Sequence, residues 1–202
     1  MPLSMPASPS FRDCRFRLIS NAARFVSPLT RVGQSVARIG DFWSAAITLP
    51  PLTRDQARAW TAILASMAGQ AESLYVGPPV EQDDLGALGT PRVNGAAQAG
   101  TTLIVDGFPA GKTLAAGIWF SYDTATFRSL HVTTAAFAAD GAGAGSLAIA
   151  PAIRKSPAED ALIEFIAPSC EMVLEDASAD ALNLQQSVTW GVSLSLIENV
   201  RA

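Results

Sequence analysis

The chain has 202 residues, which suffices for one sizeable domain or two small ones. Hydrophobic residues make up 49% of it and charged residues only 16%, but 36 residues are alanine, which buries little surface per side chain. The longest charge-free run, 181–197, is interrupted by Asn, Gln, Ser and Thr, so no segment offers the roughly 20 apolar residues of a membrane-spanning helix. A long disordered chain is excluded as well, because so much apolar surface collapses in water.

Neither the first residues nor the cysteines point to a secreted, disulfide-stabilised protein. Residues 1–17 carry three prolines and lack the continuous apolar run of a secretory signal. Cys14 and Cys170 are the only cysteines, and they lie far apart in the sequence. We interpret them as reduced, buried thiols, with a single disulfide between them as the alternative.

The net charge of −4 is unevenly distributed along the chain. Residues 1–79 carry +4, whereas residues 80–168 and residues 169–202 carry −4 each. The first and last parts therefore cancel if they fold together. No segment has the dense Lys and Arg stripe of a nucleic-acid-binding protein.

Alternation with a period of two predicts strands towards both ends of the chain. Apolar and charged residues alternate over Cys14–Leu18, and a looser alternation follows over Val32–Arg38. Trp43–Leu49 has one apolar face and ends at two prolines, which cannot donate to a strand ladder. The clearest strand is Val188–Leu196, in which large apolar residues alternate with Gly, Thr and Ser.

One helix is predicted, over about residues 53–68. Thr53 is a favourable N-cap, and Gln56 three residues later completes a capping box. Apolar residues recur at helical spacing from Trp60 to Met67, and Gly69 then stands just beyond the helix end. We expect this amphipathic helix to cover an open face or end of a sheet.

The middle of the chain predicts a second set of strands. Residues 77–100 are rich in turn-forming residues and are interpreted as a connection. Four short strands follow, separated by Gly and Asp turns: Thr101–Val105, Ile118–Tyr122, Ser129–Thr133 and Ser146–Ile149. The predicted fold class is mainly β with one α-helix. Residues 1–79 and 169–202 are expected to form one sandwich- or barrel-like domain, and residues 80–168 an inserted small β-barrel module.

Two glycine-rich segments resemble phosphate loops only superficially. Residues 107–113 end in Gly-Lys-Thr, but Asp106 occupies the place of the first glycine, and a strand rather than a helix follows. The run 140–145, which starts at Asp140 and then alternates glycine with alanine, is explained by a flexible hairpin loop. We predict no cofactor at either segment.

The ionisable residues form no catalytic or metal-binding pattern. His131 is the only histidine and lies in an apolar strand, so it is predicted to be structural or on the surface. This histidine and two distant cysteines lack the spacing of a zinc site. The acidic pairs Asp83-Asp84 and Glu159-Asp160 stand in loop-like sequence and are predicted to be solvated. We therefore predict that the protein is not an enzyme and has no catalytic residue, metal or cofactor.

Four segments carry a likeness to a known family. They are Trp43–Gly69, Gly89–Gly100, Val105–Pro109 and Asp140–Pro151, the last followed by Arg154 and Pro157. In this order they resemble the distal tail protein family of long-tailed, siphovirus-like phages and gene transfer agents. The likeness covers about residues 40–157, and the final strand running into Glu198 also fits. Aromatic and charged residues, which the family usually has after Gly117, are fewer in this sequence.

This resemblance implies a structural virion protein with a tail-tube-like β domain that assembles into a homo-hexameric ring, from which the inserted barrel projects outward. Such a ring links the tail tube protein ring to the baseplate hub protein and leaves a channel for DNA ejection, through which phage DNA passes without specific binding. The implied location is the tail tip of the virion, after assembly in the cytoplasm of the host bacterium, and no membrane insertion is implied. The family supplies no catalytic residues.

Two other functions compete with this one. A carbohydrate-binding host-adhesion module of the tail tip requires exposed aromatic side chains, for which Trp119, Tyr122 and Phe127 are the candidates. A cell-wall hydrolase requires an acid pair or a histidine-centred triad in a cleft. The remaining tryptophans lie on the apolar faces of their elements and are predicted to pack in a core: Trp43, Trp60 and Trp190.

Overall fold

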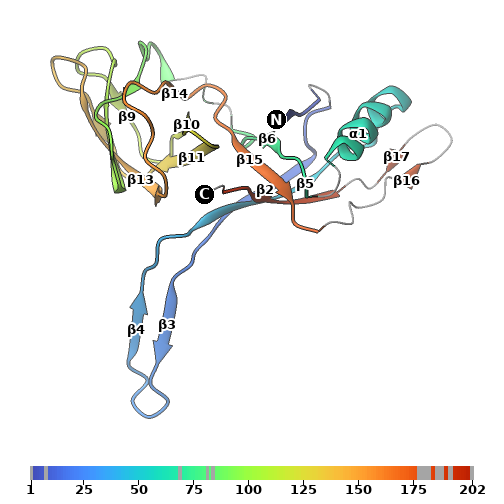
Figure 1. Cartoon of the computed structure of the whole chain (residues 1–202), viewed down its shortest axis with the longest axis horizontal. Coiled ribbons are helices and arrows are strands. Elements are labelled where there is room, and N and C mark those ends of the chain that lie inside the picture. Colours follow the sequence, from blue (N-terminus) through green and yellow to red (C-terminus); the bar gives the residue numbers. More distant parts are fainter. Residues whose placement is uncertain are drawn as a thin grey trace.

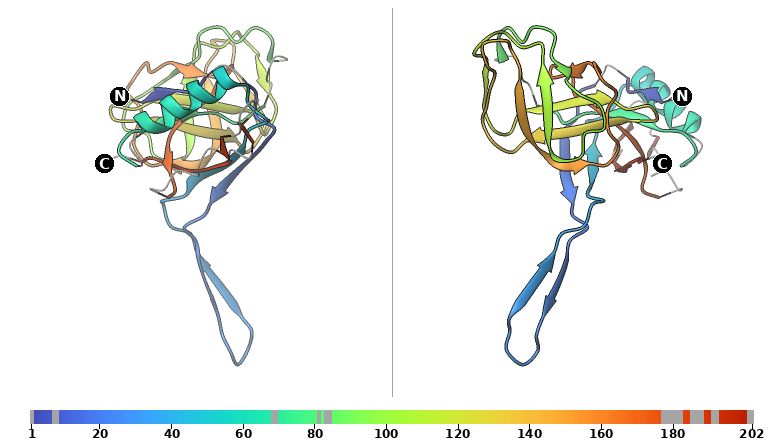
Figure 2. Two further views of the ribbon diagram at one scale, coloured as in Figure 1. Left: turned by 90° about the vertical axis from the view of Figure 1, so that its right-hand side faces the viewer. Right: turned by 60° about the vertical axis from the view of Figure 1, so that its left-hand side comes forward.

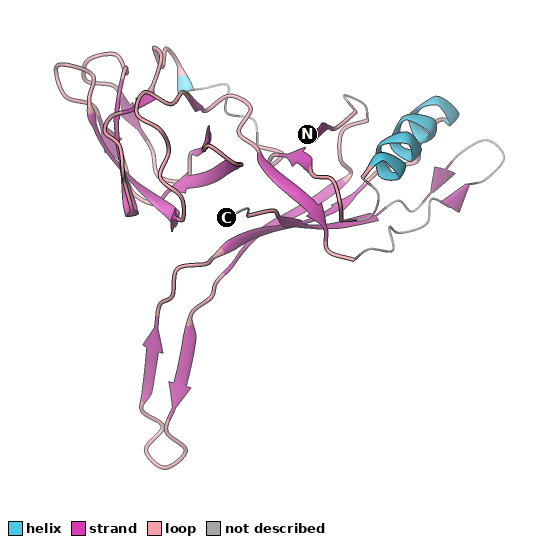
Figure 3. Cartoon of the chain, in the orientation of Figure 1, coloured by secondary structure: helices cyan, strands magenta, loops and turns pink. Residues whose placement is uncertain are grey.

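The computed structural model describes residues 2–6, 9–67, 70–80, 82, 85–176, 183–184, 189–190 and 193–200. Within these residues the fold is mainly β with one α-helix, which confirms the predicted fold class (Figure 3). Two six-stranded sheets form the body, and a narrow hairpin projects from it (Figure 1).

The first sheet joins both ends of the chain. Its strand order is β1-β6-β15-β18-β5-β2, and the β1–β6 pair is parallel whereas the other pairs are antiparallel. The strands are β1 (Leu3–Ser4), β2 (Asp13–Ile19), β5 (Phe42–Thr48), β6 (Leu74–Val76), β15 (Cys170–Leu174) and β18 (Ser193–Glu198). The strands predicted over Cys14–Leu18 and Trp43–Leu49 are therefore confirmed, and they pair with each other along their whole length.

The second sheet is a nearly closed barrel made from the middle of the chain. Its order is β14-β10-β11-β13-β8-β7, with β7 (Arg92–Val93), β8 (Gly100–Asp106), β10 (Trp119–Asp123), β11 (Arg128–Thr133), β13 (Gly145–Ile153) and β14 (Ile163–Glu164). The two edges meet where Arg92 forms an antiparallel bridge with Leu162. The segment 77–100 is thus more than the predicted connection, because β7 within it closes the barrel; a two-residue strand carries too little alternation to be recognised in the sequence.

Three two-stranded ribbons complete the described strands. β3 (Ala23–Val26) pairs with β4 (Gly33–Val36), β9 (Thr113–Leu114) with β12 (Phe137–Ala138), and β16 (Asn183–Leu184) with β17 (Thr189–Trp190). The strand predicted over Val188–Leu196 is described only in part. Its end lies in β18, its residues 189–190 lie in β17, and Val188, Gly191 and Val192 fall outside the described residues.

The helix α1 (Arg54–Ser66) begins as its capping box predicts. Thr53 N donates to Gln56 Oε1 at 3.0 Å, and Gln56 N donates back to Thr53 Oγ1 at 3.5 Å. The helix ends at Ser66 with Met67 as its C-cap, whereas the predicted end marker Gly69 lies outside the described residues. Its buried residues Ala57, Trp60 and Leu64 join the core of the first sheet.

β10 and β11 contribute side chains to the hydrophobic cores of both sheets. Side chains on one face of this pair, including Phe120 and Tyr122, enter the core of the barrel, whereas Trp119 and Leu130 on the other face join the core of the first sheet. Because both faces of these strands are covered, the barrel is fixed to the first sheet by apolar packing. Cys14 and Cys170 are both free, as predicted, and burial raises the pKa of each thiol.

Candidate functional site

The segment that resembles a phosphate loop forms a turn between strands, as the sequence predicts. Lys112 N donates to Pro109 O at 3.0 Å, and β9 begins directly at Thr113, so no helix N-terminus is available for an anion. The ammonium group of Lys112 donates to the backbone carbonyl of Leu85. The lysine is therefore engaged in holding the barrel rather than directed at a ligand site.

The glycine-rich run 140–145 is folded around its own acidic residue. Asp140 Oδ1 accepts hydrogen bonds from Ala142 N at 2.8 Å and Ala144 N at 2.9 Å. The N–H groups of Ala144 and Ala142 lower the pKa of the Asp140 carboxyl. Gly143 has φ +81°, and a Cβ there would lie 2.0 Å from Phe108 O. The Asp140 carboxylate thus accepts the hydrogen bonds that these N–H groups would have to donate to a phosphate. We therefore interpret the turn as structural.

His131 lies in a sealed site at the centre of the barrel. It is 0% exposed and stacks against Tyr122, with ring centroids 5.0 Å apart. Its Nδ1 lies 3.0 Å from Pro151 O, and its Nε2 lies 2.8 Å from Ser129 Oγ. Because a carbonyl only accepts, Nδ1 carries the proton and Nε2 accepts from the Ser129 hydroxyl.

Burial lowers the pKa of His131 from its usual 6.5 to about 3, against the opposing effect of the Pro151 carbonyl. The Ser129–His131 pair has the separation of a nucleophile and its base, but a backbone carbonyl stands where a triad has an acid. With both side chains buried, substrate has no access to the hydroxyl. The histidine is therefore a buried structural residue. This is one of the two alternatives predicted from the sequence, the other being a position on the surface.

A buried ion pair connects the barrel to the first sheet. Arg154 Nη2, just after β13, lies 2.6 Å from Glu198 Oε2 at the end of β18, and the two side chains are 11% and 0% exposed. The same oxygen accepts from Trp43 N at 3.0 Å. Burial raises the pKa of Glu198, whereas Arg154 and the Trp43 N–H oppose that rise. Sequence analysis missed this pair because its two residues are distant in the chain and stand in no motif.

Trp43 and Trp119 also lie where the barrel meets the first sheet. We term this contact between the two sheets the joint, and it consists of Trp43, Trp119, Leu130, Arg154 and Glu198. Trp43 Nε1 donates to Leu130 O at 2.8 Å. The rings of Trp43 and Trp119 lie 4.7 Å apart between centroids. Removing either partner of the Arg154–Glu198 pair would leave the other charge buried and uncompensated, and Glu198 Oε1 has no hydrogen-bond partner among the described residues.

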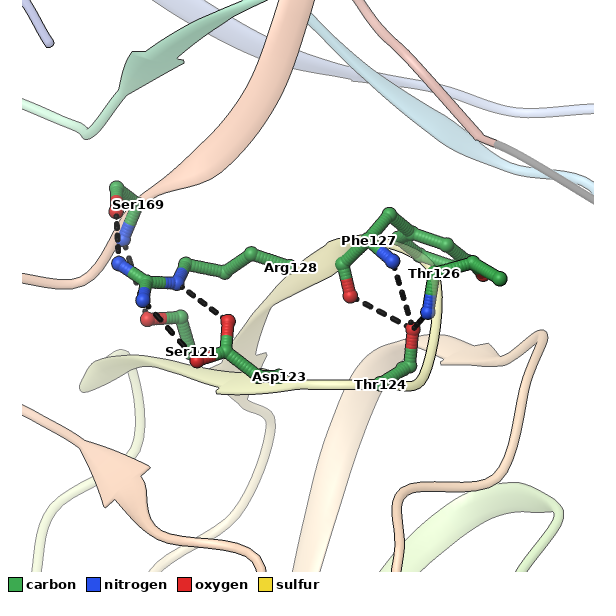
Figure 4. Close-up of polar contacts among 7 residues, drawn as sticks. All are labelled: Ser121, Asp123, Thr124, Thr126, Phe127, Arg128 and Ser169. Atoms are coloured by element: carbon green, nitrogen blue, oxygen red, sulfur yellow. Dashed lines mark hydrogen bonds and ion pairs between the residues drawn. The ribbon is translucent and has the colours of Figure 1, made fainter. Parts of the chain in front are cut away.

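Arg128 ties the far end of the β10–β11 hairpin to the first sheet (Figure 4). Its guanidinium donates to both oxygens of Asp123, at 2.7 and 3.1 Å, and to Ser169 Oγ at 3.3 Å. It also lies over the ring of Tyr75 in β6, 4.7 Å from the centroid. The hydrogen bond to Asp123 raises the pKa of Arg128, and the contacts of its guanidinium anchor the hairpin.

The aromatic side chains that a sugar-binding surface requires are covered. Tyr122 and Phe127 are 2% and 3% exposed, and Trp119 packs in the joint. Trp43 and Trp60 are buried as predicted, at 4% and 0% exposure, whereas the side chain of Trp190 lies outside the described residues. Tyr122 and Phe127 therefore offer no exposed platform for a carbohydrate, and Trp119 is partly buried against the core of the first sheet.

The predicted acidic pairs form no catalytic arrangement among the described residues. Asp83-Asp84 lies outside them. Glu159 and Asp160 are exposed as predicted, and Asp160 Oδ2 lies 3.2 Å from Arg92 Nη1, beside the seam of the barrel. No group of three or more His, Cys, Asp and Glu side chains in the described part of the chain is arranged to hold a metal ion.

The most unusual surface is the projecting hairpin, which we term the arm (residues 20–40). It continues β2 and β5 away from the body, and both views in Figure 2 show it reaching beyond the two sheets. Among the described residues, eleven large apolar side chains are exposed, and six of them lie in the arm: Phe25, Val26, Leu29, Val32, Val36 and Ile39. Leu29, at the tip, is 93% exposed. An isolated two-stranded hairpin is only marginally stable in water, so this element is suited to being covered by a partner.

The register of the arm shows which of its side chains share a face. Ala23 pairs with Val36 and Phe25 pairs with Gln34, so Phe25 and Val36 lie on one face. Arg24 pairs with Ser35, which places Arg24 and Val26 on the other face. Both faces thus carry exposed apolar side chains, which the described residues leave uncovered.

The arm is also charged oppositely to the rest of the chain. Residues 20–40 contain Arg24, Arg31 and Arg38 and no acidic residue, a charge of +3 in a chain whose net charge is −4. All other residues together therefore carry −7.

The described residues include no helix of the length and apolar character that crossing a membrane requires. In comparison with known proteins, the chain matches no protein-family model and no curated protein sequence.

Proposed function

We propose that this protein is a structural protomer that assembles through its arm into a closed, hexameric ring at the distal end of a phage tail. The arm carries the proposal, because it exposes six large apolar side chains that a single copy leaves uncovered. The family resemblance of residues 40–157 supports the placement in a tail. The ring links the tail tube ring to the baseplate hub in the virion, after assembly in the bacterial cytoplasm.

A closed ring is compatible with the asymmetry of such a contact. The arm is a donor surface, and the surface that receives it lies elsewhere on the next copy, so the contact is head to tail. Head-to-tail contacts close into rings when the rotation between neighbours divides a full turn. The free edges of the first sheet, at β1 and β2, provide further main-chain groups that a neighbour can pair.

The charge of the chain suits passage of DNA without retention. Each copy is acidic overall, and DNA binding without sequence specificity depends on Lys and Arg contacts to phosphates. A channel formed by six such copies has no net positive charge to hold DNA. Among competing functions, the carbohydrate-binding module has less support, since Tyr122 and Phe127 are buried and Trp119 is partly buried against the first sheet.

The test is the oligomeric state of a matched pair of variants, measured by native mass spectrometry and negative-stain imaging. We expect six-fold rings for the wild-type chain, loss of rings in Val36→Ser on the face that also carries Phe25, and retention of rings in Val26→Ser on the face that carries Arg24. The two valines are 41% and 50% exposed in facing strands of one hairpin, so the change in strand propensity is matched. A wild-type chain that stays monomeric at high concentration would contradict the proposal.

A further inference from the structure

The loop between β7 and β8 contains a chemically reactive pair of residues. Asn94-Gly95 is the only Asn-Gly pair in the sequence. Glycine after asparagine favours deamidation, because it has no side chain to shield its backbone nitrogen from the asparagine amide. Gly95 has φ +102°, a conformation that residues with a side chain rarely adopt. The loop therefore requires a glycine at this place, and the fold retains the reactive pair.

The side chain of Gln98 binds the backbone on both sides of Gly95. Gln98 Nε2 donates to Asn94 O and to Gly95 O, each at 2.9 Å. The same amide is anchored on β8, where Gln98 Oε1 accepts from Ile104 N at 2.6 Å and Gln98 Nε2 donates to Ile104 O at 3.1 Å. One N–H group faces Oε1 and three carbonyl groups surround Nε2, so these partners fix the orientation of the amide.

These hydrogen bonds oppose the movement that deamidation requires. The reaction brings Gly95 N to bonding distance of Cγ of Asn94, and this movement rotates the peptide group whose carbonyl oxygen accepts from Gln98. Asn94 is also held on the other side of its Cα, because Asn94 N donates to Ile104 O at 3.0 Å. The rotation therefore has to break hydrogen bonds that the loop otherwise keeps.

We propose that Asn94 is a deamidation site of this chain and that the side chain of Gln98 holds it in the unreacted form. In the reaction, Gly95 N loses its proton to hydroxide and forms a bond to Cγ of Asn94. The side-chain nitrogen of Asn94 takes a proton from water and leaves as ammonia. Another water molecule then opens the succinimide ring to aspartate or isoaspartate. This proposal concerns the chemical lifetime of the fold and does not depend on the proposed function.

The position of the pair gives the reaction a structural consequence. Asn94 directly follows β7, the strand that closes the barrel, and Val93 of β7 pairs with Val105. Isoaspartate lengthens the backbone by a methylene group, and both products add a negative charge. We expect the longer backbone to displace the hydrogen bond between Asn94 N and Ile104 O, which continues the pairing of β7 with β8. The contacts of Gln98 thus protect the closure of the barrel.

The test is the rate of deamidation at Asn94 in the purified chain, followed by peptide mass spectrometry and isoaspartate content. Gln98→Glu keeps nearly the same shape but directs a carboxylate oxygen at the three carbonyl groups. We expect Asn94 to react at least about tenfold faster in this variant than in the wild-type chain, and likewise in Gln98→Ala. Circular dichroism establishes that each variant is folded during the measurement.

Gln82→Ala is the matched control, because Gln82 also bridges backbone groups of the barrel through its amide. Gln82 Oε1 accepts from Trp119 N at 2.7 Å, and Gln82 Nε2 donates to Trp119 O at 3.0 Å and to Phe165 O at 2.6 Å. None of these partners belongs to the loop of Asn94. We therefore expect the rate at Asn94 in Gln82→Ala to stay within about twofold of the wild-type rate.

Three outcomes would overturn the proposal. Folded Gln98 variants that react no faster than wild type would show that the side chain does not protect Asn94. An equal acceleration in Gln82→Ala would show that general loosening of the barrel controls the rate. The third comparison needs no variant: Asn94 of the wild-type chain should react at least about tenfold more slowly in buffer than in concentrated urea at the same pH, and equal rates would show that the folded loop gives no protection.

Discussion

The two halves of one long hairpin differ in how far their side chains are buried. At its base, β2 and β5 pair over seven residues, and Trp43, Ala45 and Ile47 of β5 are buried beneath the helix and the barrel. At its far end, β3 and β4 alternate in the same manner, but Phe25 and Val36 stay exposed. The difference teaches that alternation defines a face of a strand pair, whereas its burial depends on what another element, or another copy, brings to that face.

The largest expected effect is at the base of the hairpin. Trp43→Ala should lower the free energy of unfolding by about 3–5 kcal/mol, because it removes a buried ring and the hydrogen bond to Leu130 that holds the barrel. Urea denaturation followed by circular dichroism measures this change. A loss below about 1 kcal/mol would show that the joint does not stabilise the fold.

A smaller, pH-dependent effect is expected from the sealed histidine in the barrel. The pKa of His131 is lowered from 6.5 to about 3 in the folded chain, so folding excludes a proton that the unfolded chain binds. Its contribution to stability is therefore fully present above pH 6.5 and is lost as the pH falls towards 3, with a slope approaching about 1.4 kcal/mol per pH unit.

The comparison of wild type with His131→Gln isolates this slope. The free energy of unfolding of the variant should fall less steeply over the same pH range, so the difference between the two proteins narrows as the pH decreases. Urea titrations at several pH values between 7 and 3 give both profiles. Parallel profiles would mean that the pKa of His131 is the same in the folded and the unfolded chain.

The smallest expected effect is at the far end of the hairpin. Phe25→Ala should change the free energy of unfolding of the isolated chain by less than about 0.5 kcal/mol, because its ring is 62% exposed. The free energy of unfolding of this variant is measured in dilute solution, where the chain is monomeric. The variant is the matched counterpart of Trp43→Ala, because both replace an aromatic residue of the same hairpin by alanine. A loss near 2 kcal/mol would mean that the single chain itself covers the arm.

Much of the fold was predictable because its signals are local. The capping box at Thr53 and Gln56, the alternation in β2 and β5, and the turns between the barrel strands all lie within a few residues of the structure they specify. The same holds for the glycine-rich turns, where Asp106 and the missing helix excluded a phosphate loop in the sequence itself. Local backbone preference and side-chain period suffice for such elements.

The sequence by itself determined the class of fold and its single described helix, and it favoured free cysteines over a disulfide. Only the tertiary structure decided that β7 closes the barrel, that Arg154 meets Glu198, and that β10 and β11 are covered on both faces. The physical reason is that these contacts join residues far apart in the chain, so their energies depend on where the two sheets meet rather than on any local pattern. The arm is the remaining case: its two faces follow from the register, and the neighbour that we propose to cover it lies beyond a single chain.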